Sequence, residues 1–162
     1  MSTSNQKFQF IPFIICLIIP LSIGALGGFF TMEAVKTWYT TLNKPSFNPP
    51  NYLFGPVWST LYAIMGIASY LVWKRRKTAK NYTLAASIYF IQLVLNLMWS
   101  FIFFYQQQIG LALIEIIFLL VAIIANSILF YKINKVAGLL YIPYIMWVSF
   151  ATVLTYSIYM LN

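Results

Sequence analysis

Five long apolar segments limit what this chain can fold into more than any other feature of its sequence. They cover residues 8–30, 53–73, 82–104, 109–131 and 138–160. Each is long enough to cross a bilayer as a helix of about 20 residues. A membrane-spanning β-strand would instead need about 10 residues of alternating polarity. We therefore expect an all-α membrane protein, a bundle of five transmembrane helices that forms a single domain over residues 1–162.

Composition excludes the soluble classes of protein. Only 7% of the residues are charged and 62% are hydrophobic, whereas about 25% of the residues of a soluble domain are charged. The same hydrophobicity excludes a disordered chain, and a single cysteine excludes a disulfide scaffold. Membrane lipids are therefore the expected surroundings of the chain.

The ten basic residues are divided unevenly between the two sides of the predicted bundle. Eight lie on one side, namely Lys7, Lys74, Arg75, Arg76, Lys77, Lys80, Lys132 and Lys135. Lys36 and Lys44 lie on the other side. The positive-inside rule then predicts a multi-pass protein with its N-terminus in the cytoplasm and its C-terminus outside. This placement accounts for the net charge of +8 without a nucleic-acid partner, and it is compatible with anionic lipids near residues 74–80.

The connection between the first two segments, about Thr31 to Tyr52, is the only long one. It carries Trp38, Tyr39, Lys44 and three prolines, namely Pro45 and the pair Pro49 and Pro50. Prolines fix their own φ and restrict the preceding residue, and the aromatic side chains can be buried against the bundle. Long loops in compact domains are usually functional or disordered. Because the prolines and the aromatic side chains restrict this loop, we expect it to be ordered and to cover the outer end of the bundle.

Polar side chains within the apolar segments gather in the outer half of the predicted bundle. Gln92, Asn96 and Ser100 recur every four residues and are expected to share a helix face. Glu115 lies about 9 Å along its helix from the outer end. Such groups are costly in lipid and normally face the bundle interior or a cavity.

Aromatic and small side chains occupy the same half. Trp58 and Tyr62 lie one turn apart near the outer end of the second segment. Trp147 lies near the middle of the fifth segment, with Ala151 and Leu154 following outward on its face. Together with the polar residues, they predict a pocket beneath the long loop.

Each of these residues also has a purely structural explanation. Trp58 suits the aromatic belt at a membrane surface. Asn96 suits a hydrogen bond between helices, which contributes about 0.6 kcal/mol on average. Glu115 suits a protonated or paired structural residue. The coincidence of several such groups at one depth favours the pocket over these explanations.

Missing residue types restrict the chemistry further. The chain has no histidine, which excludes histidine metal sites, catalytic triads and the usual haem ligand, and we expect no metal site. Glu33 and Glu115, its two carboxylates, lie on different elements and form neither an EF-hand nor a two-metal site. By contrast, 14 Phe, 12 Tyr and 5 Trp residues favour flat, π-rich ligands. An indole can also pass an electron to an excited dye.

Several stretches resemble the TspO/MBR family, that is, tryptophan-rich sensory proteins and translocator proteins of the peripheral benzodiazepine receptor type. The stretches are WYTTLNKPSFNPP (38–50), FGPVWSTLYAIMGIASYLVWK (54–74), LVLNLMWSFIFF (93–104), ALIEI (112–116) and PYIMWVSFATVL (143–154). They follow the family order over the long loop and four of the five segments. The most specific part is FGPVWxxLYxxMG followed by PYxxWxxFAT.

The resemblance implies a five-helix bundle, commonly a homodimer, with a pocket beneath the first loop for porphyrins and isoquinoline-type drugs. Protoporphyrin IX or haem would be a ligand, and no cofactor is required. By motif, the pocket residues are Trp38, Tyr39, Pro49, Pro50, Trp58, Tyr62, Asn96, Trp147 and Ala151. The residue pattern described above adds Ser100, Glu115 and Leu154 to this set.

Three functions follow from the resemblance. The first is a tetrapyrrole-binding protein of the bacterial cell (inner) membrane that acts in porphyrin transport, sensing or stress response. The second is an enzyme that degrades protoporphyrin IX in light, for which Trp58 and Trp147 match the implicated tryptophans. The third is a membrane protein whose interactions with a partner are regulated by the ligand.

The chain departs from the family pattern at two places. Phe47 stands where the loop motif usually has tryptophan. The animal cholesterol motif needs a basic residue after its tyrosine, and none follows Tyr156, so cholesterol is a doubtful ligand. Residues 129–135 fit the looser cholesterol pattern, which has little specificity.

Overall fold

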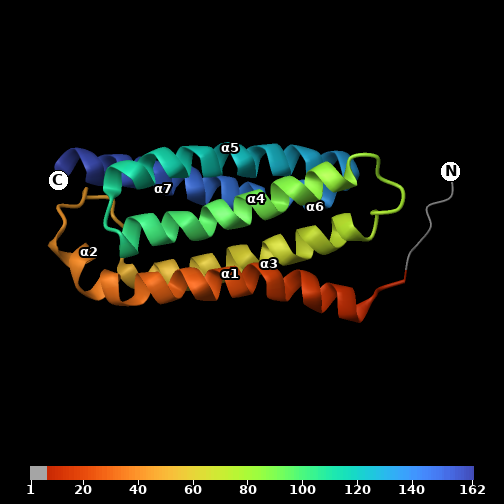
Figure 1. The fold of residues 1–162 in the computed structure, drawn as a ribbon, viewed down its shortest axis with the longest axis horizontal. Coiled ribbons are helices and arrows are strands. Elements are labelled where there is room, and N and C mark those ends of the chain that lie inside the picture. Colours follow the sequence, from red (N-terminus) through yellow and green to blue (C-terminus); the bar gives the residue numbers. More distant parts are fainter. Residues whose placement is uncertain (1–6) are drawn as a thin grey trace.

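The computed structural model describes residues 7–162 and consists of helices that run side by side along one long axis (Figure 1). The long helices are α1 (Phe10–Lys36), α3 (Phe54–Trp73), α4 (Tyr82–Ser100), α5 (Ile109–Ile133) and α7 (Ile142–Leu161). The short ones are α2 (Trp38–Thr41), α6 (Lys135–Leu139), the 3₁₀ turn η1 (Asn51–Leu53) and the π-helical turn η2 (Phe101–Tyr105). The predicted all-α fold with five long helices is confirmed.

Five stretches of the described residues are long and apolar enough to cross a membrane. They are Phe10–Lys36, Asn51–Trp73, Tyr82–Tyr105, Ile109–Ile133 and Lys135–Leu161. Large apolar side chains such as Phe29, Phe118 and Met146 remain more than half exposed on the outside of the bundle. Because a helix satisfies its backbone hydrogen bonds internally, such faces are stable against lipid.

Two helices differ most from the predicted ones. The first helix continues beyond residue 30 to Lys36, because residues 31–36 contain good helix formers and neither glycine nor proline. The loop predicted from residue 31 is therefore shorter, and it contains the extra helix α2. The last predicted helix, 138–160, is divided into α6 and α7, and Pro143 lies in the first turn of α7, where a proline loses no hydrogen bond.

Helices α1 and α3 approach each other closely at a glycine. A Cβ atom at Gly66 of α3 would lie 2.8 Å from the Cα atom of Leu17, so only glycine fits there without moving a backbone. Farther along α1, Gly24 packs against the ring of Tyr62, whereas Gly28 has open space around it. The Gly24-x-x-x-Gly28 spacing therefore serves a contact within the chain at its first glycine.

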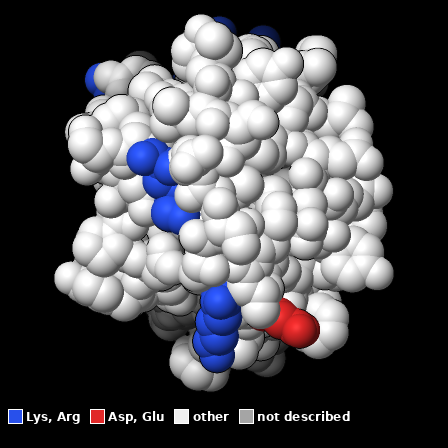
Figure 2. Space-filling view, turned by 90° about the vertical axis from the view of Figure 1, so that its left-hand side faces the viewer, with Lys and Arg blue, Asp and Glu red and all other residues white. Residues whose placement is uncertain are grey.

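The two ends of the bundle differ in charge. The α3–α4 connection and α6 lie at one end, and α2 and the C-terminus lie at the other (Figure 1). The α3–α4 connection carries five basic residues within 74–80. Figure 2, which looks at the end with α2 and the C-terminus, shows a surface with few charged side chains. The uneven distribution of basic residues along the sequence thus corresponds to a difference in charge between the two ends of the bundle.

Candidate ligand-binding site

The loop between α1 and α3 is held in place by its own side chains. The Tyr39 hydroxyl donates a hydrogen bond to Asn48 Oδ1 at 2.7 Å. Burial raises the pKa of Tyr39 to about 12, so its hydroxyl stays a donor at neutral pH. Lys44 Nζ donates to the carbonyl oxygen of Tyr39 at 2.6 Å and lies 4.9 Å from the centroid of its ring. Asn43 N donates to Asn162 Oδ1 at 2.9 Å, which ties the loop to the end of α7. The predicted loop is thus an ordered cover.

Aromatic packing seats this cover on the bundle. Tyr39 is almost completely buried, and its ring centroid lies 6.0 Å from that of Phe104 and 6.2 Å from that of Phe103. Trp38 meets Phe103 edge-on, with 5.5 Å between the ring centroids. Edge-to-face contacts at these distances stabilise aromatic pairs beyond the burial of their area.

The π-helical turn η2 supplies the side chains below the cover. Gln106 N donates to the carbonyl oxygen of Phe101 at 2.9 Å, a bond that spans five residues instead of four. Within this turn Phe103 and Phe104 are both buried, and Phe103 stacks on Trp99 with ring centroids 5.2 Å apart. Turns of this kind occur frequently at functional sites.

A pocket lies directly beneath the cover, and aromatic side chains nearly fill it. Its lining residues come from α2, α3, α4, η2 and α7, and they are Tyr39, Phe54, Trp58, Trp99, Phe103, Phe104, Trp147, Ala151, Leu154, Thr155 and Ile158. The remaining volume is about 20 Å³. We call this space the closed pocket. It holds no more than about one water molecule.

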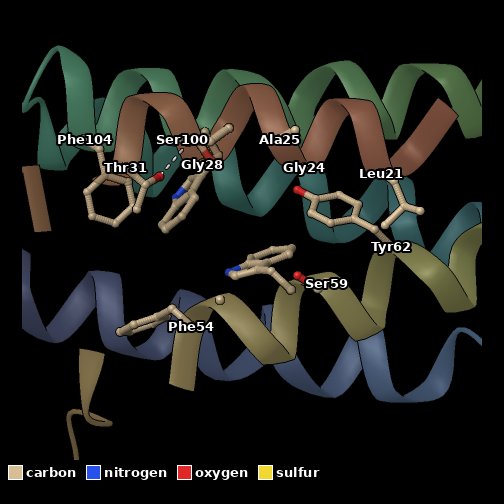
Figure 3. A pocket seen from close by; sticks show the side chains of 14 residues that line it. Leu21, Gly24, Ala25, Gly28, Thr31, Phe54, Ser59, Tyr62, Ser100 and Phe104 are labelled. Carbon is tan, nitrogen blue, oxygen red and sulfur yellow. Dashed lines mark hydrogen bonds between the residues drawn. The ribbon is translucent and has the colours of Figure 1, made fainter. Parts of the chain in front are cut away.

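A larger cavity of about 320 Å³ lies beside the closed pocket, between α1, α3 and α4. We call it the side cavity. Tyr62 and Leu21 lie at one end of it, and Phe104 and Thr31 lie at the other (Figure 3). Ala25 of α1 lines it and is exposed, so the cavity opens outward between α1 and α3. Its volume is at the lower end of the range for small-molecule sites.

The closed pocket and the side cavity share a wall. The shared side chains are those of Phe54, Trp58, Trp99 and Phe104. Trp58 stacks on Tyr62 with ring centroids 5.7 Å apart and contacts Tyr144 edge-on at 6.3 Å. The two spaces therefore border each other along these four side chains.

Trp147 forms another wall of the closed pocket. It also lines an apolar groove of about 580 Å³ between α3 and α7, on the outside of the bundle. Phe54, which lines both the closed pocket and the side cavity, lies edge-on to Trp147, with 6.1 Å between their ring centroids. The Trp147 Nε1 is buried and has no hydrogen-bond partner among the described residues.

A buried chain of hydrogen bonds connects three helices below the pocket. The Tyr62 hydroxyl of α3 donates to Asn96 Oδ1 of α4. Asn96 Nδ2 donates to the Tyr144 hydroxyl of α7 at 3.0 Å, and Tyr144 donates to Gln92 Oε1 at 3.0 Å. Gln92 Nε2 faces Met65 Sδ at 3.7 Å. The polar face predicted for Gln92 and Asn96 therefore joins α3, α4 and α7.

Glu115 of α5 is buried, and both of its carboxyl oxygens lack a hydrogen-bond partner among residues 7–162. It lines none of the cavities described here. The described residues contain no group of three or more His, Cys, Asp and Glu that could hold a metal ion.

The structure divides the predicted site residues between these spaces. The closed pocket is lined by Tyr39, Trp58, Trp147, Ala151 and Leu154, and the side cavity by Trp58, Tyr62 and Ser100. The remaining ones line neither space, because Trp38 packs on Phe103, Asn96 belongs to the hydrogen-bond chain, and Pro49 and Pro50 lie in the cover.

Sequence reasoning missed several residues that line these spaces. The main ones are Phe54, Trp99, Phe103, Phe104 and the α1 glycines Gly24, Gly27 and Gly28. Trp99 stands in one of the motif stretches and next to Ser100, which is a signal that could have identified it. The glycines carried a packing signal but none for a cavity.

Comparisons of the sequence with known proteins point to one family. The sequence model of the TspO/MBR family matches residues 16–161. The chain is 41% identical to the tryptophan-rich protein TspO of Archaeoglobus fulgidus, covering 90% of this chain and 94% of that protein. It is 39% identical to the protein of the same name from Chlorobaculum tepidum, covering 95% of this chain and 98% of that protein. It is also 39% identical to the human translocator protein, covering 83% of this chain and 80% of that protein.

The hydrogen-bond chain predicts a specific pattern of stability changes. Asn96→Leu leaves the buried Tyr62 hydroxyl without its acceptor, and we expect it to lower the free energy of unfolding in detergent by about 1–3 kcal/mol. In the double variant Tyr62→Phe/Asn96→Leu there is no hydroxyl at residue 62 that lacks an acceptor, and part of the lost free energy of unfolding should be recovered. Thermal or denaturant unfolding of the purified protein measures both. Strictly additive losses would contradict this role of the pair.

Proposed function

Because the chain belongs to the TspO/MBR family, we propose that it binds a porphyrin, such as protoporphyrin IX or haem, in the outer half of its helix bundle. The names of its relatives, translocator and sensory protein, lead us to propose transport, sensing or a stress response as the purpose of this binding. Isoquinoline-type drugs would bind at the same place, and the functional unit would be a homodimer.

The observation that carries this proposal is the position of Trp58 in the wall between the closed pocket and the side cavity. A flat tetrapyrrole needs extended aromatic faces and more room than either space offers alone. Rotation of Trp58 and Phe54 would join the two spaces and place the ligand between indole and phenyl rings. Since the chain has no histidine, iron would receive no imidazole ligand, and haem should bind about as well as the metal-free porphyrin.

Substitution of Ala151 tests this location. Ala151 lines the closed pocket, so the methyl and hydroxyl groups added by Ala151→Thr would overfill it. We expect wild-type affinity for protoporphyrin IX to be about 1 µM or weaker, which corresponds to about 8 kcal/mol. The variant should lose about 1–3 kcal/mol of this binding free energy, measured by titration in detergent.

The matched control is Ala125→Thr in α5, because Ala125 is half-buried and lines neither the closed pocket nor the side cavity. It should bind porphyrin like the wild type. Equal affinities for the wild type and Ala151→Thr would place the porphyrin elsewhere. Binding no tighter than to empty micelles would refute the proposed function.

One observation favours a light-dependent reaction as a second candidate. Trp58 and Trp147 lie on different helices, yet both line the closed pocket. A porphyrin held there would have an oxidisable indole close by on two sides, and the cover would keep reactive products from escaping.

Phenylalanine substitutions separate this chemistry from binding. Trp58→Phe and Trp147→Phe keep an aromatic face for stacking but remove the readily oxidised indole. We expect both variants to retain most of the porphyrin affinity and to slow the loss of porphyrin absorbance in light, with no loss in the dark. If the wild type bleaches porphyrin no faster than micelles do, the protein is not a photochemical enzyme. If the variants bleach it at the wild-type rate, the indoles are only pocket walls.

The proposal also includes an orientation in a bacterial cell membrane. The end of the bundle with residues 74–80 carries most of the basic residues, and such ends face the cytoplasm. The N-terminus would then be cytoplasmic, and the cover with Ser46 would face outward.

Cysteine labelling measures this orientation. In a Cys16→Ala background, we expect Ser46→Cys to react with a membrane-impermeant maleimide in intact cells, because Ser46 is exposed in the cover. Lys77→Cys, exposed in the α3–α4 connection, should react only after the membrane is permeabilised. The opposite pattern would reverse the orientation, and labelling of both in intact cells would refute it.

A further inference from the structure

Another cavity lies at the basic end of the bundle, away from the cover. Its volume is about 200 Å³, and α1, α3, α4 and α5 line it. Ile15 of α1 and Phe90 of α4 belong to its lining and are both about half exposed. The cavity therefore opens between α1 and α4 toward the lipid. We call it the inner cleft.

A guanidinium group lies at the end of the inner cleft nearest the membrane surface. Trp73, the last residue of α3, lines the cleft. The guanidinium carbon of Arg76 lies 3.5 Å from the centroid of the Trp73 ring, and its Nη1 donates to the Trp73 carbonyl oxygen at 3.2 Å. Stacking fixes the plane of the guanidinium and leaves most of its five N–H donors free for an anion.

The charges around the cleft entrance all have one sign. Besides Arg76, the connection 74–80 contributes Lys74, Arg75, Lys77 and Lys80. Arg75 is engaged within the bundle, because its Nη1 donates to the carbonyl oxygen of Ile133 at 2.7 Å. The two acidic side chains of the chain, Glu33 near the end of α1 and Glu115 near the start of α5, lie toward the opposite end. An anion at this entrance thus meets only positive charge.

A buried hydroxyl group inside the cleft lacks a partner. Tyr89 of α4 lines the cleft and is 5% exposed, and its hydroxyl makes no hydrogen bond to any of the described residues. The neighbouring Ser69 hydroxyl also lines the cleft, but it donates to the carbonyl oxygen of Gly66 at 2.9 Å. Its ring is held by stacking on Phe130, with centroids 5.8 Å apart. Side chains on a helix point back toward its N-terminus, so this hydroxyl is displaced from its own Cα toward Tyr82 and the basic end. An acceptor supplied by a ligand would remove the cost of leaving it unpaired.

We propose that the inner cleft binds an anionic glycerophospholipid from the leaflet at the basic end. Its phosphate contacts Arg76, one acyl chain enters the cleft past Ile15 and Phe90, and an ester carbonyl accepts a hydrogen bond from Tyr89. The lipid phosphate meets the guanidinium of Arg76, the acyl chain meets the apolar lining of the cleft, and the ester carbonyl between them meets the Tyr89 hydroxyl. A free anion would leave the apolar cleft and Tyr89 unused, and a neutral lipid would leave Arg76 unused.

Lipid titrations on the purified full chain in detergent test this site. Native mass spectrometry compares phosphatidylglycerol with phosphatidylcholine carrying identical acyl chains, and glycerol 3-phosphate serves as an anion without chains. We expect phosphatidylglycerol to bind at least fivefold more tightly than phosphatidylcholine, as expected for one basic side chain near an anionic surface. Glycerol 3-phosphate should not compete at the same concentrations. Equal binding of the two lipids, or full competition by glycerol 3-phosphate, would overturn the proposal.

Variants locate the bound lipid. Arg76→Gln should lower the affinity for phosphatidylglycerol about fivefold and leave the affinity for phosphatidylcholine unchanged. Its matched control is Lys135→Gln, which removes one exposed positive charge at the same end and should leave both affinities within twofold of wild type. Equal losses in the two variants would mean a general attraction to the basic end and would overturn the site.

Two further variants test the cleft itself. Ala86→Leu should fill the cleft, which Ala86 lines, and Tyr89→Phe should remove the hydroxyl without adding an atom. Both variants should lower the affinity for the two lipids by the same factor, because the two lipids have the same acyl chains and ester groups. If neither changes lipid binding, the acyl chain does not lie in the inner cleft. Should Ala86→Leu fail to fold, Tyr89→Phe decides the question alone.

Discussion

The hydrogen-bond chain from Tyr62 through Asn96 and Tyr144 to Gln92 is the interaction on which the outer half of this bundle depends. Lipid offers no partner for these groups, so each must find one inside the protein. Their mutual satisfaction fixes the relative rotation of α3, α4 and α7. The Tyr62 ring also supports Trp58 by stacking, and the polar chain thereby positions the wall between the closed pocket and the side cavity.

Above this polar layer, most of the side chains that line the closed pocket are aromatic rings. The cover rests on Phe103 and Phe104, and the π-helical turn brings both of these adjacent residues into the core. Aromatic rings packed edge-on can rotate without losing a hydrogen bond, which a polar lining could not do. A nearly filled pocket of this kind is compatible with ligands of different outline, because the walls rather than the backbone adapt.

Much of this architecture could be predicted from the sequence, since long apolar segments and their basic flanks are local patterns. Gln92 and Asn96 both belong to the hydrogen-bond chain, whereas Ser100 lies outside it and faces the side cavity. Four residues overshoot one helical turn by about 40°, so two such steps carry Ser100 well round the helix. The inward positions of Phe103 and Phe104 depend on the π turn, and the division into separate spaces depends on ring orientations. Neither leaves a periodic signal.

The side cavity opens between α1 and α3, where Ala25 and Leu21 are exposed on the lipid-facing surface. A hydrophobic compound dissolved in the bilayer would therefore reach it by lateral diffusion in two dimensions, without leaving the membrane. Occupancy is then set by the mole fraction of the compound among the lipids. The same protein will show different aqueous half-saturation concentrations at different lipid or detergent loads, even though its intrinsic affinity is constant.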